Sequence, residues 1–399
     1  MNKKVVLAYS GGLDTSYCVK YLTVEKGLDV HTVAVDTGGF SQDEYSFLEQ
    51  RAKELGAVSH HTINAVEKYY EQCVKYLIFG NVLKNNTYPL SVSAERFFQA
   101  IAVAEYAQKI DAAYVAHGST GAGNDQIRFD LAFQILAPNV EIITPIRDGQ
   151  LTRQQEVAYL KKHGVELSWE KAKYSINQGL WGTSVGGAET LTSHQALPED
   201  AYPSEVKQTT PKKITIGFET GEPVSLDGKT VTPVQVIRQL NELASAYAIG
   251  RDIHVGDTII GIKGRVGFEA AAALVIIKAH HLLEKHTQSK DQQQLKAFLA
   301  DTYGNKLHEA EFLDPVMRDI EAFFSSTQQR VTGEVFVSLA PYRFSLLGIE
   351  SKYDLMKSKA GQYGEENKAW SADEAKGFIK IYGMAQKIYH NVNASQDEN

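Results

Sequence analysis

The stretch that decides the fold is Val5-Val6-Leu7-Ala8-Tyr9-Ser10-Gly11-Gly12-Leu13-Asp14-Thr15-Ser16. Its apolar start predicts a buried strand, and the residues that follow it predict a helix. A strand that passes into a helix through two glycines points several backbone N–H groups at one place, where the helix dipole also attracts anions. Glycine is expected there because side chains would block the approach and because the turn requires a positive φ. We interpret the stretch as a phosphate-binding loop.

Polar side chains in the same stretch fit this interpretation. Ser10, Thr15 and Ser16 provide hydroxyl donors, and Asp14 is a carboxylate where a magnesium–phosphate complex would bind one. The common P-loop needs G-x-x-x-x-G-K-[ST], a string that does not occur in the chain. The string S-G-G-L-D-T-S resembles instead the signature of the pyrophosphate-loop ATPases, which cleave ATP between its α and β phosphates. A glycine-rich turn that binds nothing is the alternative.

The composition is that of a globular enzyme. The chain has 399 residues, of which 43% are hydrophobic and 22% charged, and this length suffices for two or three domains. A net charge of −7 argues against an extended nucleic-acid-binding surface. Cys18 and Cys73 lie in helix-like stretches and suggest a reducing compartment. The longest apolar run, Ala270–Ile277, is too short to span a bilayer, and we expect a cytoplasmic protein without membrane contact.

Strand and helix patterns alternate along residues 1–165, which we predict to be the nucleotide-binding domain. After the first unit the expected strands are Val30–Asp36, Val58–Ile63, Ala113–Ala116 and Glu141–Ile146. The expected helices are one opened by the capping box Ser41–Glu44, Ala65–Phe79, Ser93–Ile110 and one capped by Thr152. This alternation predicts an α/β fold with a doubly wound parallel sheet, and ligands are expected beyond the carboxyl ends of its strands.

The pattern changes after residue 165. Residues 166–365 predict an α+β substrate domain, with hairpins at 213–226 and 335–347 and helices that start at Thr232-Pro233 and Ala270. Residues 366–399 form a third segment with an amphipathic helix over Ala372–His390. Such a helix docks either on a neighbouring subunit or back on its own chain.

A second string, Ala116-His117-Gly118-Ser119-Thr120-Gly121-Ala122-Gly123-Asn124-Asp125-Gln126-Ile127-Arg128-Phe129, follows a predicted strand. Its glycines allow close approach of the backbone to a ligand. Asn124 can donate and accept, Arg128 can grip a carboxylate with two N–H groups, and Asp125 can hold an amine. The cluster is typical of a site for a small zwitterion beside a nucleotide, and a solvated loop is the alternative.

The strings Tyr9–Ser16 and His117–Phe129 together resemble the argininosuccinate synthase family. The resemblance extends to Gly261-Ile262-Lys263-Gly264-Arg265 and Gly377-Phe378-Ile379-Lys380, and so covers nearly the whole chain. It implies a pyrophosphate-loop ATPase domain, an α+β synthetase domain and a C-terminal oligomerisation helix. It also implies a homotetrameric C–N ligase that joins citrulline to aspartate with ATP and Mg²⁺, in arginine biosynthesis.

The resemblance carries site residues over to this chain. ATP is assigned to Ala8, Tyr9, Ser10, Gly11, Gly12, Leu13, Asp14, Thr15, Ser16, Val35 and Gly118. Aspartate is assigned to Thr120, Asn124 and Asp125, and citrulline to Tyr88, Ser93, Asn124, Arg128, Ser175 and Ser184. The candidate catalytic residues are Asp14, Asp125 and Arg128. No resident metal cluster is expected, and Mg²⁺ would come with ATP.

The implied chemistry needs positioning more than a protein nucleophile. The ureido oxygen of citrulline attacks the α-phosphorus of ATP, which gives a citrullyl-adenylate and pyrophosphate. The neutral amine of aspartate then attacks the activated carbon, and AMP leaves. Stabilisation of charge and alignment of the reactants dominate such transfers.

Three positions depart from the family pattern. Ala122 stands where many members have Lys, Gly256 replaces a Glu that contacts citrulline, and Phe268 replaces a Tyr of the same pocket. A buried ammonium without a partner would be costly. One hypothesis is therefore that Asp257 takes over the ammonium of citrulline, and another is that the substrate is an N-acetyl- or N-succinylcitrulline.

Other functions fit the sequence less well. A glutamine-dependent amidotransferase would need a nucleophilic cysteine, often at the N-terminus, where Asn2 stands. A tRNA-thiolating enzyme would need catalytic cysteines and a basic face. A non-catalytic ATP-binding module would not need the string Asn124–Arg128. The pairs His60-His61 and His280-His281 lack i,i+4 partners and nearby cysteines, and are interpreted as surface histidines or as structural histidines of the core.

Overall fold

The computed structural model describes residues 2–165, 173–361 and 369–394. The chain divides into two compact units, Met1–Ser351 and Lys352–Asn399. The expected domain boundaries, after residues 165 and 365, fall at or within parts of the chain outside the described residues.

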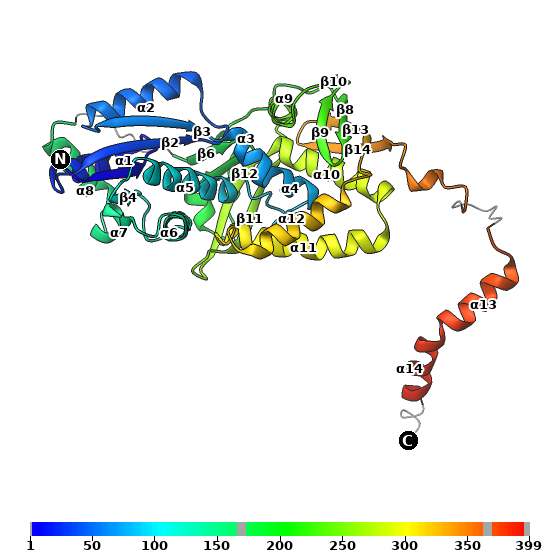
Figure 1. The fold of residues 1–399 in the computed structure, drawn as a ribbon. Helices are drawn as coiled ribbons and strands as arrows, with labels where there is room; N and C mark the ends of the chain where they lie inside the picture. Colours follow the sequence, from blue (N-terminus) through cyan, green and yellow to red (C-terminus); the bar gives the residue numbers. More distant parts are fainter. Residues whose placement is uncertain (1, 166–172, 362–368, 395–399) are drawn as a thin grey trace. The chain divides into compact units, whose positions relative to one another are not determined.

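The first unit contains a five-stranded parallel sheet with the strand order β3-β2-β1-β4-β5 (Figure 1). The strands are β1 (Lys4–Ala8), β2 (Asp29–Asp36), β3 (Ser59–Asn64), β4 (Tyr114–Ala116) and β5 (Glu141–Ile143). The chain order reverses between β1 and β4, and ligands of doubly wound sheets bind at such a switch point. The predicted parallel sheet is confirmed.

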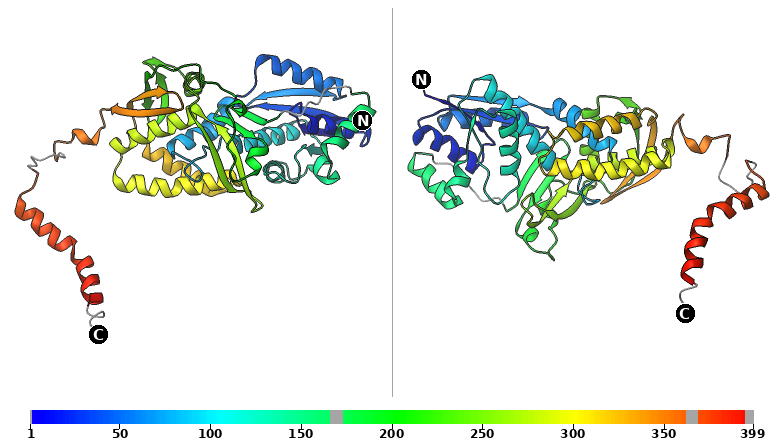
Figure 2. Two further views of the ribbon diagram at one scale, coloured as in Figure 1. Left: turned by 180° about the vertical axis from the view of Figure 1, so that it is seen from behind. Right: turned by 60° about the horizontal axis from the view of Figure 1, so that its bottom comes forward.

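Helices cover both faces of this sheet (Figure 2), and alternating side chains of the strands pack against them. Val5 and Leu7 pack with α1 (Leu13–Val24), α2 (Gln42–Glu54) and α8 (Arg153–Lys162), whereas Val6 packs with α5 (Ser91–Lys109) and α6 (Asp125–Leu136). The period of two along a strand explains this division. The capping boxes predicted at Ser41 and Thr152 are both present.

Two predicted elements of this domain differ in detail. The helical stretch 65–79 is α3 (Val66–Tyr69), a π-helical turn (Tyr70–Val74) and α4 (Lys75–Phe79). The strand predicted to end at Ile146 ends at Ile143, and α7 (Pro145–Gly149) follows. Pro145 lacks the N–H that a strand would donate, and its fixed φ suits the first turn of a helix.

Two antiparallel sheets complete the first unit, with the orders β10-β9-β8-β13-β14 and β11-β12-β7-β6. The first consists of β8 (Lys212–Glu219), β9 (Glu222–Leu226), β10 (Lys229–Thr230), β13 (Gly333–Ala340) and β14 (Arg343–Glu350), and contains both predicted hairpins. The second consists of β6 (Ser175–Gly179), β7 (Gly182–Gly186), β11 (Arg251–Asp257) and β12 (Lys263–Glu269), and its hairpins were not predicted.

Helices pack around these sheets. They are α9 (Pro233–Ser245), α10 (Ala271–Thr287), α11 (Lys290–His308) and α12 (Pro315–Thr327), with 3₁₀ turns at Ala188–Leu191 and Glu199–Ala201. In α10, His280 is fully buried and its ring nitrogens bond Asn81 at 2.7 Å and Gln328 at 2.9 Å. This is the structural histidine that we predicted. None of the described helices combines the length and apolar character needed to cross a bilayer.

The second unit contains a 3₁₀ turn (Leu355–Lys357) and two helices, α13 (Ala372–Tyr382) and α14 (Met384–Ala394). The single predicted helix is therefore interrupted at Gly383. The apolar side chains Phe378, Ile381 and Ile388 are exposed.

Candidate functional site

The loop between β1 and α1 has the geometry of an anion-binding loop. Gly11 has a φ of +71°, and a Cβ there would lie 2.6 Å from Leu48, so the position requires glycine. The Ser10 hydroxyl lies 3.3 Å from that of Thr15 and accepts the Gly12 N–H at 3.4 Å. Gly12 is the N-cap of α1 and no side chain caps this helix, so its first N–H groups are available for a ligand.

The loop after β4 lies directly opposite. A Cβ at Gly118 would be 3.3 Å from the backbone nitrogen of Thr15, which shows how closely the two loops approach. His117 fixes the second loop, because its Nδ1 accepts the Ser119 N–H at 3.2 Å and its Nε2 bonds Asp130 at 2.9 Å. The two glycine-rich strings therefore meet at the switch point of the sheet.

Several buried polar atoms around the first loop have no hydrogen-bond partner. They are the hydroxyls of Tyr9 and Ser16 and one carboxylate oxygen of Glu156. Burial and the neighbouring Asp14 carboxylate raise the pKa of Glu156 to about 8. Buried polar groups are normally satisfied, so these atoms mark a place where a polar ligand or cation would fit.

Arg128 and Asp125 form the centre of the predicted substrate side. Arg128 is buried and donates from Nη1 to Asp125 at 2.8 Å and from Nη2 to the backbone oxygen of His308 at 3.0 Å. Burial would raise the pKa of Asp125, but Arg96 and Arg128 outweigh it and hold that pKa below its ordinary value. The carboxylate therefore stays charged beside the guanidinium groups.

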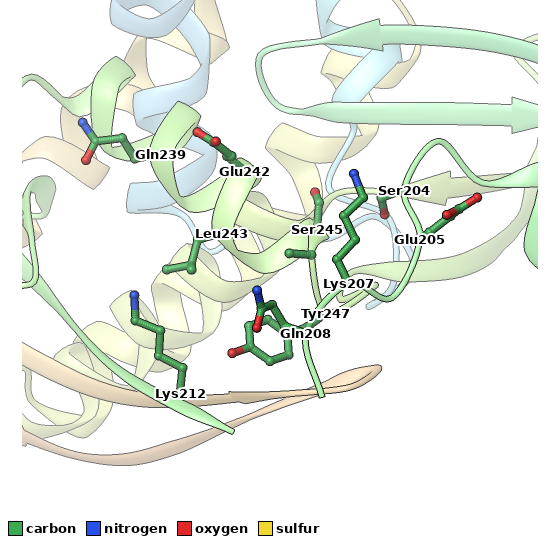
Figure 3. A pocket seen from close by; sticks show the side chains of 11 residues that line it. Ser204, Glu205, Lys207, Gln208, Lys212, Gln239, Glu242, Leu243, Ser245 and Tyr247 are labelled. Atoms are coloured by element: carbon green, nitrogen blue, oxygen red, sulfur yellow. The ribbon is translucent and has the colours of Figure 1, made fainter. Parts of the chain in front are cut away.

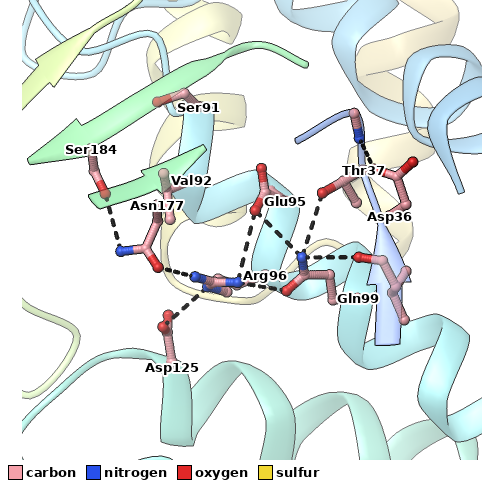
Figure 4. A network of polar contacts seen from close by, with 12 residues as sticks. Asp36, Thr37, Ser91, Val92, Glu95, Arg96, Gln99, Asp125, Asn177 and Ser184 are labelled. Atoms are coloured by element: carbon pink, nitrogen blue, oxygen red, sulfur yellow. Dashed lines mark hydrogen bonds and ion pairs between the residues drawn. The ribbon is translucent and has the colours of Figure 1, made fainter. Parts of the chain in front are cut away.

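Arg96 joins this centre to the β6–β7 hairpin (Figure 4). Its Nε lies 3.4 Å from Asp125, and its Nη2 donates to Asn177 of β6. The Asn177 amide donates in turn to Ser184 of β7 at 3.5 Å. Beside it, Glu95 is buried, and burial raises the pKa of this carboxyl to about 8 even though Arg96 opposes the shift. Sequence reasoning missed Arg96 and Asn177, because their roles depend on pairing between distant segments.

Two further predicted citrulline residues lie among aromatic rings. The Tyr88 ring stacks on that of His254 with centroids 5.2 Å apart and lies 5.4 Å from the ring of Phe268. Ser93 bonds the Nδ1 atom of His308 at 3.1 Å. His254 and His308, like Arg96, were not predicted as site residues.

The β11–β12 hairpin closes this side of the site. The side-chain oxygen of Asn124 (Oδ1) accepts the Ile259 N–H at 2.9 Å, and the side-chain amide of Asn85 (Nδ2) donates to the Val255 backbone oxygen at 3.0 Å. Along β11, His254 and Gly256 are buried whereas Val255 and Asp257 are exposed. Asp257 thus points to the opposite face and pairs with Lys263 at 2.5 Å. The hypothesis that Asp257 replaces a pocket carboxylate was wrong, because one step along a strand reverses the side chain.

The predicted residues are thus brought together to different degrees. Contacts link Tyr88, Asn124, Asp125, Arg128 and Ser184 with the hairpins or with one another, and Ser93 with His308 of α11. Val35 is buried at the end of β2, where its oxygen accepts from Gln99 at 3.4 Å. Thr120 and Ser175 are exposed. Ser175 lies on the same face of β6 as Asn177, two residues away.

A separate surface pocket of about 610 Å³ lies beside α9 and includes Lys207, Glu242 and Tyr247 (Figure 3). None of the predicted site residues lines it.

Two family models match the chain. One, described as the arginosuccinate synthase N-terminal HUP domain, matches residues 4–166, and the other, described as the arginosuccinate synthase C-terminal domain, matches residues 174–389. The chain belongs to the argininosuccinate synthase family. It is 38% identical to argininosuccinate synthase of Xylella fastidiosa over 99% of both chains, and 36% identical to that of Methanocaldococcus jannaschii over 98% of both. That of Dictyoglomus thermophilum is 37% identical over 97% of both.

Membership of the argininosuccinate synthase family confirms the resemblance, the fold class and the expected enzyme class, an AMP-forming C–N ligase. These similarities give the N-acylated citrulline alternative no support over citrulline itself.

Proposed function

We propose that the chain condenses citrulline with aspartate at the expense of ATP, releasing AMP and pyrophosphate. The observation that carries the proposal is the meeting of the Ser10–Ser16 loop with the loop of Gly118 beside the Asp125–Arg128 pair. The first loop suits phosphates, and the second leads directly to groups that suit two amino acids.

The reaction would proceed in two steps across this junction. The backbone N–H groups at Gly11 and Gly12 would stabilise the phosphates while the ureido oxygen of citrulline attacks the α-phosphorus. Pyrophosphate leaves, and the resulting citrullyl-adenylate keeps its carbon close to Asp125. There the amine of aspartate attacks this carbon, the C–O bond to AMP breaks, and argininosuccinate forms.

Mg²⁺ is part of this proposal. Asp14 and Glu156 would hold it on the side of the phosphates, and the unpartnered buried oxygen of Glu156 supports that assignment. When bound, the cation would neutralise phosphate charge. Burial and the neighbouring Asp14 carboxylate raise the pKa of Glu156, and a bound cation would lower it again by offsetting the negative charge of the pair.

The remaining proposals concern organisation. We take residues 1–165 as the nucleotide-binding domain, 166–365 as the synthetase domain and 366–399 as the C-terminal segment. The exposed apolar side chains of α13 and α14 support a homotetramer held partly by these helices. We place the enzyme in the cytoplasm, with small-molecule substrates and no nucleic-acid or membrane partner.

Pyrophosphate release from ATP tests the function. The full chain is incubated with Mg²⁺ and aspartate plus either citrulline or N-succinylcitrulline, and products are identified by mass. We expect release and argininosuccinate with citrulline only. Binding of ATP without release in either mixture would instead favour a non-catalytic ATP-binding module.

A further inference from the structure

Three buried nitrogen atoms on the substrate side have no hydrogen-bond partner. They are Nε of Arg128, Nδ1 of His254 and Nε2 of His308, on side chains only 4%, 5% and 6% exposed, respectively. Three unsatisfied nitrogens in one cluster are unusual, because burying such a group without a partner is costly. A polar ligand that binds here would satisfy them.

The cluster is held together from four elements. Arg128 of α6 bonds the backbone of His308 at the end of α11, and Ser93 of α5 bonds the His308 ring. His254 of β11 stacks on Tyr88. Gly256 leaves room for this imidazole, because a Cβ at that position would lie 2.7 Å from its Nε2.

The charges of the cluster favour an anion. Burial lowers the pKa of His308 to about 3, with Arg128, Lys84 and His254 adding to the shift and the Asp257 backbone opposing it. Burial and Lys84 also lower the pKa of His254. Both rings are therefore neutral at physiological pH, and they lie near the positively charged side chains of Arg128 and Lys84.

The nearby carboxylates are already engaged. Asp125 is paired with Arg128 and Arg96, and Asp257 faces away toward Lys263. The Ser93 hydroxyl can donate to Nδ1 of His308, which leaves the proton on Nε2 as a donor that a ligand would share with the nearby Asp257 backbone. A substrate carboxylate complements a guanidinium and imidazole N–H groups, whereas an ammonium does not.

We propose that His254 and His308, with Arg128, form a subsite that receives the carboxylate of the ureido amino acid and determines specificity for it. The inference rests on the proposed function and names residues that select its substrate. The carboxylate of citrulline is remote from its reacting ureido group, so both imidazoles would act on binding and not on the chemical steps.

Steady-state kinetics with citrulline and its carboxamide, citrullinamide, test this subsite. The variants are His254→Ala, His308→Ala and His308→Gln, in which the amide can replace the N–H donor. The control is His194→Ala, because that histidine is exposed. Thermal unfolding midpoints of all variants are measured beside the kinetics, to show that each is folded.

Each alanine variant should raise KM for citrulline by about 10- to 100-fold, the effect of losing one hydrogen bond to a charged group. KM for ATP and kcat should change by less than about 3-fold, and His308→Gln should recover about half of the loss on a logarithmic scale. The preference of the wild-type enzyme for citrulline over citrullinamide should fall about 10-fold in each alanine variant. His194→Ala should match the wild type.

If folded alanine variants keep the wild-type preference for citrulline over citrullinamide, the proposal that these histidines bind the carboxylate is wrong. An equal rise in KM for ATP and citrulline would also overturn it, because such a rise would indicate a general loss of structure. Failure of the proposed function would appear separately, as wild-type enzyme that releases no pyrophosphate with citrulline.

Discussion

The proposed phosphate loop and the proposed ureido pocket are built in opposite ways. The loop is one continuous stretch in which backbone N–H groups would bind the phosphates, and Gly11 and Gly12 leave those groups accessible. The pocket is assembled from side chains on α5, α6, α11 and the β6–β7 and β11–β12 hairpins. A site made of backbone groups is therefore specified by a short stretch of sequence. A site made of side chains depends instead on how distant segments of the chain pack together.

Replacing Arg96 should have the largest effect, because this side chain joins two of those segments. In Arg96→Ala, kcat/KM for aspartate and citrulline should fall by about 100-fold or more, since Asp125 and the β6–β7 hairpin lose their shared partner. Arg96→Lys should recover little, because one ammonium cannot bond both partners in this geometry. The exposed Arg330→Ala is the control, and initial rates at varied substrate measure the change. Full rescue by lysine would show that only the charge matters.

The loop can be perturbed through a pair of glycines with similar backbone. Gly11 and Gly56 have φ values of +71° and +99°, and both alanine variants should lose stability of about 1 kcal/mol. Only Gly11→Ala should also raise KM for ATP, by about 10-fold or more, because its Cβ would press on Leu48 and shift the loop. Denaturant unfolding and ATP titration measure the two quantities. Equal ATP affinity in both variants would show that the loop at Gly11 does not take part in nucleotide binding.

Glu95 offers a pH test at the junction between the two regions. Its pKa of about 8, raised by burial, means that the folded protein keeps a proton which the unfolded chain loses near pH 4.5. Stability should therefore fall as pH rises from about 5 to 8, by on the order of 4 kcal/mol from this group alone. Glu95→Gln, which has no proton to lose, should remove this share of the slope in urea midpoints measured across the range, whereas Glu156, whose pKa is also raised to about 8, keeps its own share. An identical slope in the variant would assign the pH dependence to other groups.

The smallest effect is expected at Asp257. Because its carboxylate lies in an exposed pair with Lys263, Asp257→Asn should change KM for citrulline by less than about 2-fold and stability by less than about 0.5 kcal/mol. Competition between citrulline and its analogues gives a second measure of the same pocket. A 10-fold rise in KM for citrulline would contradict this placement, because it would require the Asp257 side chain to face the pocket when substrate binds.

The sequence predicted the parallel sheet and the capped helices because their signals are local. The apolar runs at Val5 and Val30 predict strands, and the capping boxes at Ser41 and Thr152 predict helix starts, from a few neighbouring residues alone. The β6–β7 and β11–β12 hairpins escaped prediction because polar and glycine residues interrupt them. Helices α11 and α12 were also missed, although the capping box at Ser289 and the Asp314-Pro315 start were signals that could have found them.

The residues of the candidate site also differ in whether local sequence predicts them. The glycine loops and the Asp125–Arg128 pair follow from strings of a few residues. Arg96, His254 and His308 could not be predicted, because their partners are about 80 to 215 positions away in the chain. Asp257 failed as a prediction for the same reason, since the face of a residue is unknown until its strand is known.

One backbone contact has a further consequence. The Leu180 N–H donates to the Thr37 oxygen at 3.0 Å, and Gly39 packs so tightly on Gln178 that a Cβ would lie 2.1 Å from its oxygen. The end of β2, beside the nucleotide loop, is thus fastened to the hairpin that holds Ser184. A ligand that shifts the end of β2 would therefore also shift the β6–β7 hairpin, and the reverse. By thermodynamic reciprocity, ATP would then alter the affinity for the ureido substrate by the same factor as that substrate alters the affinity for ATP.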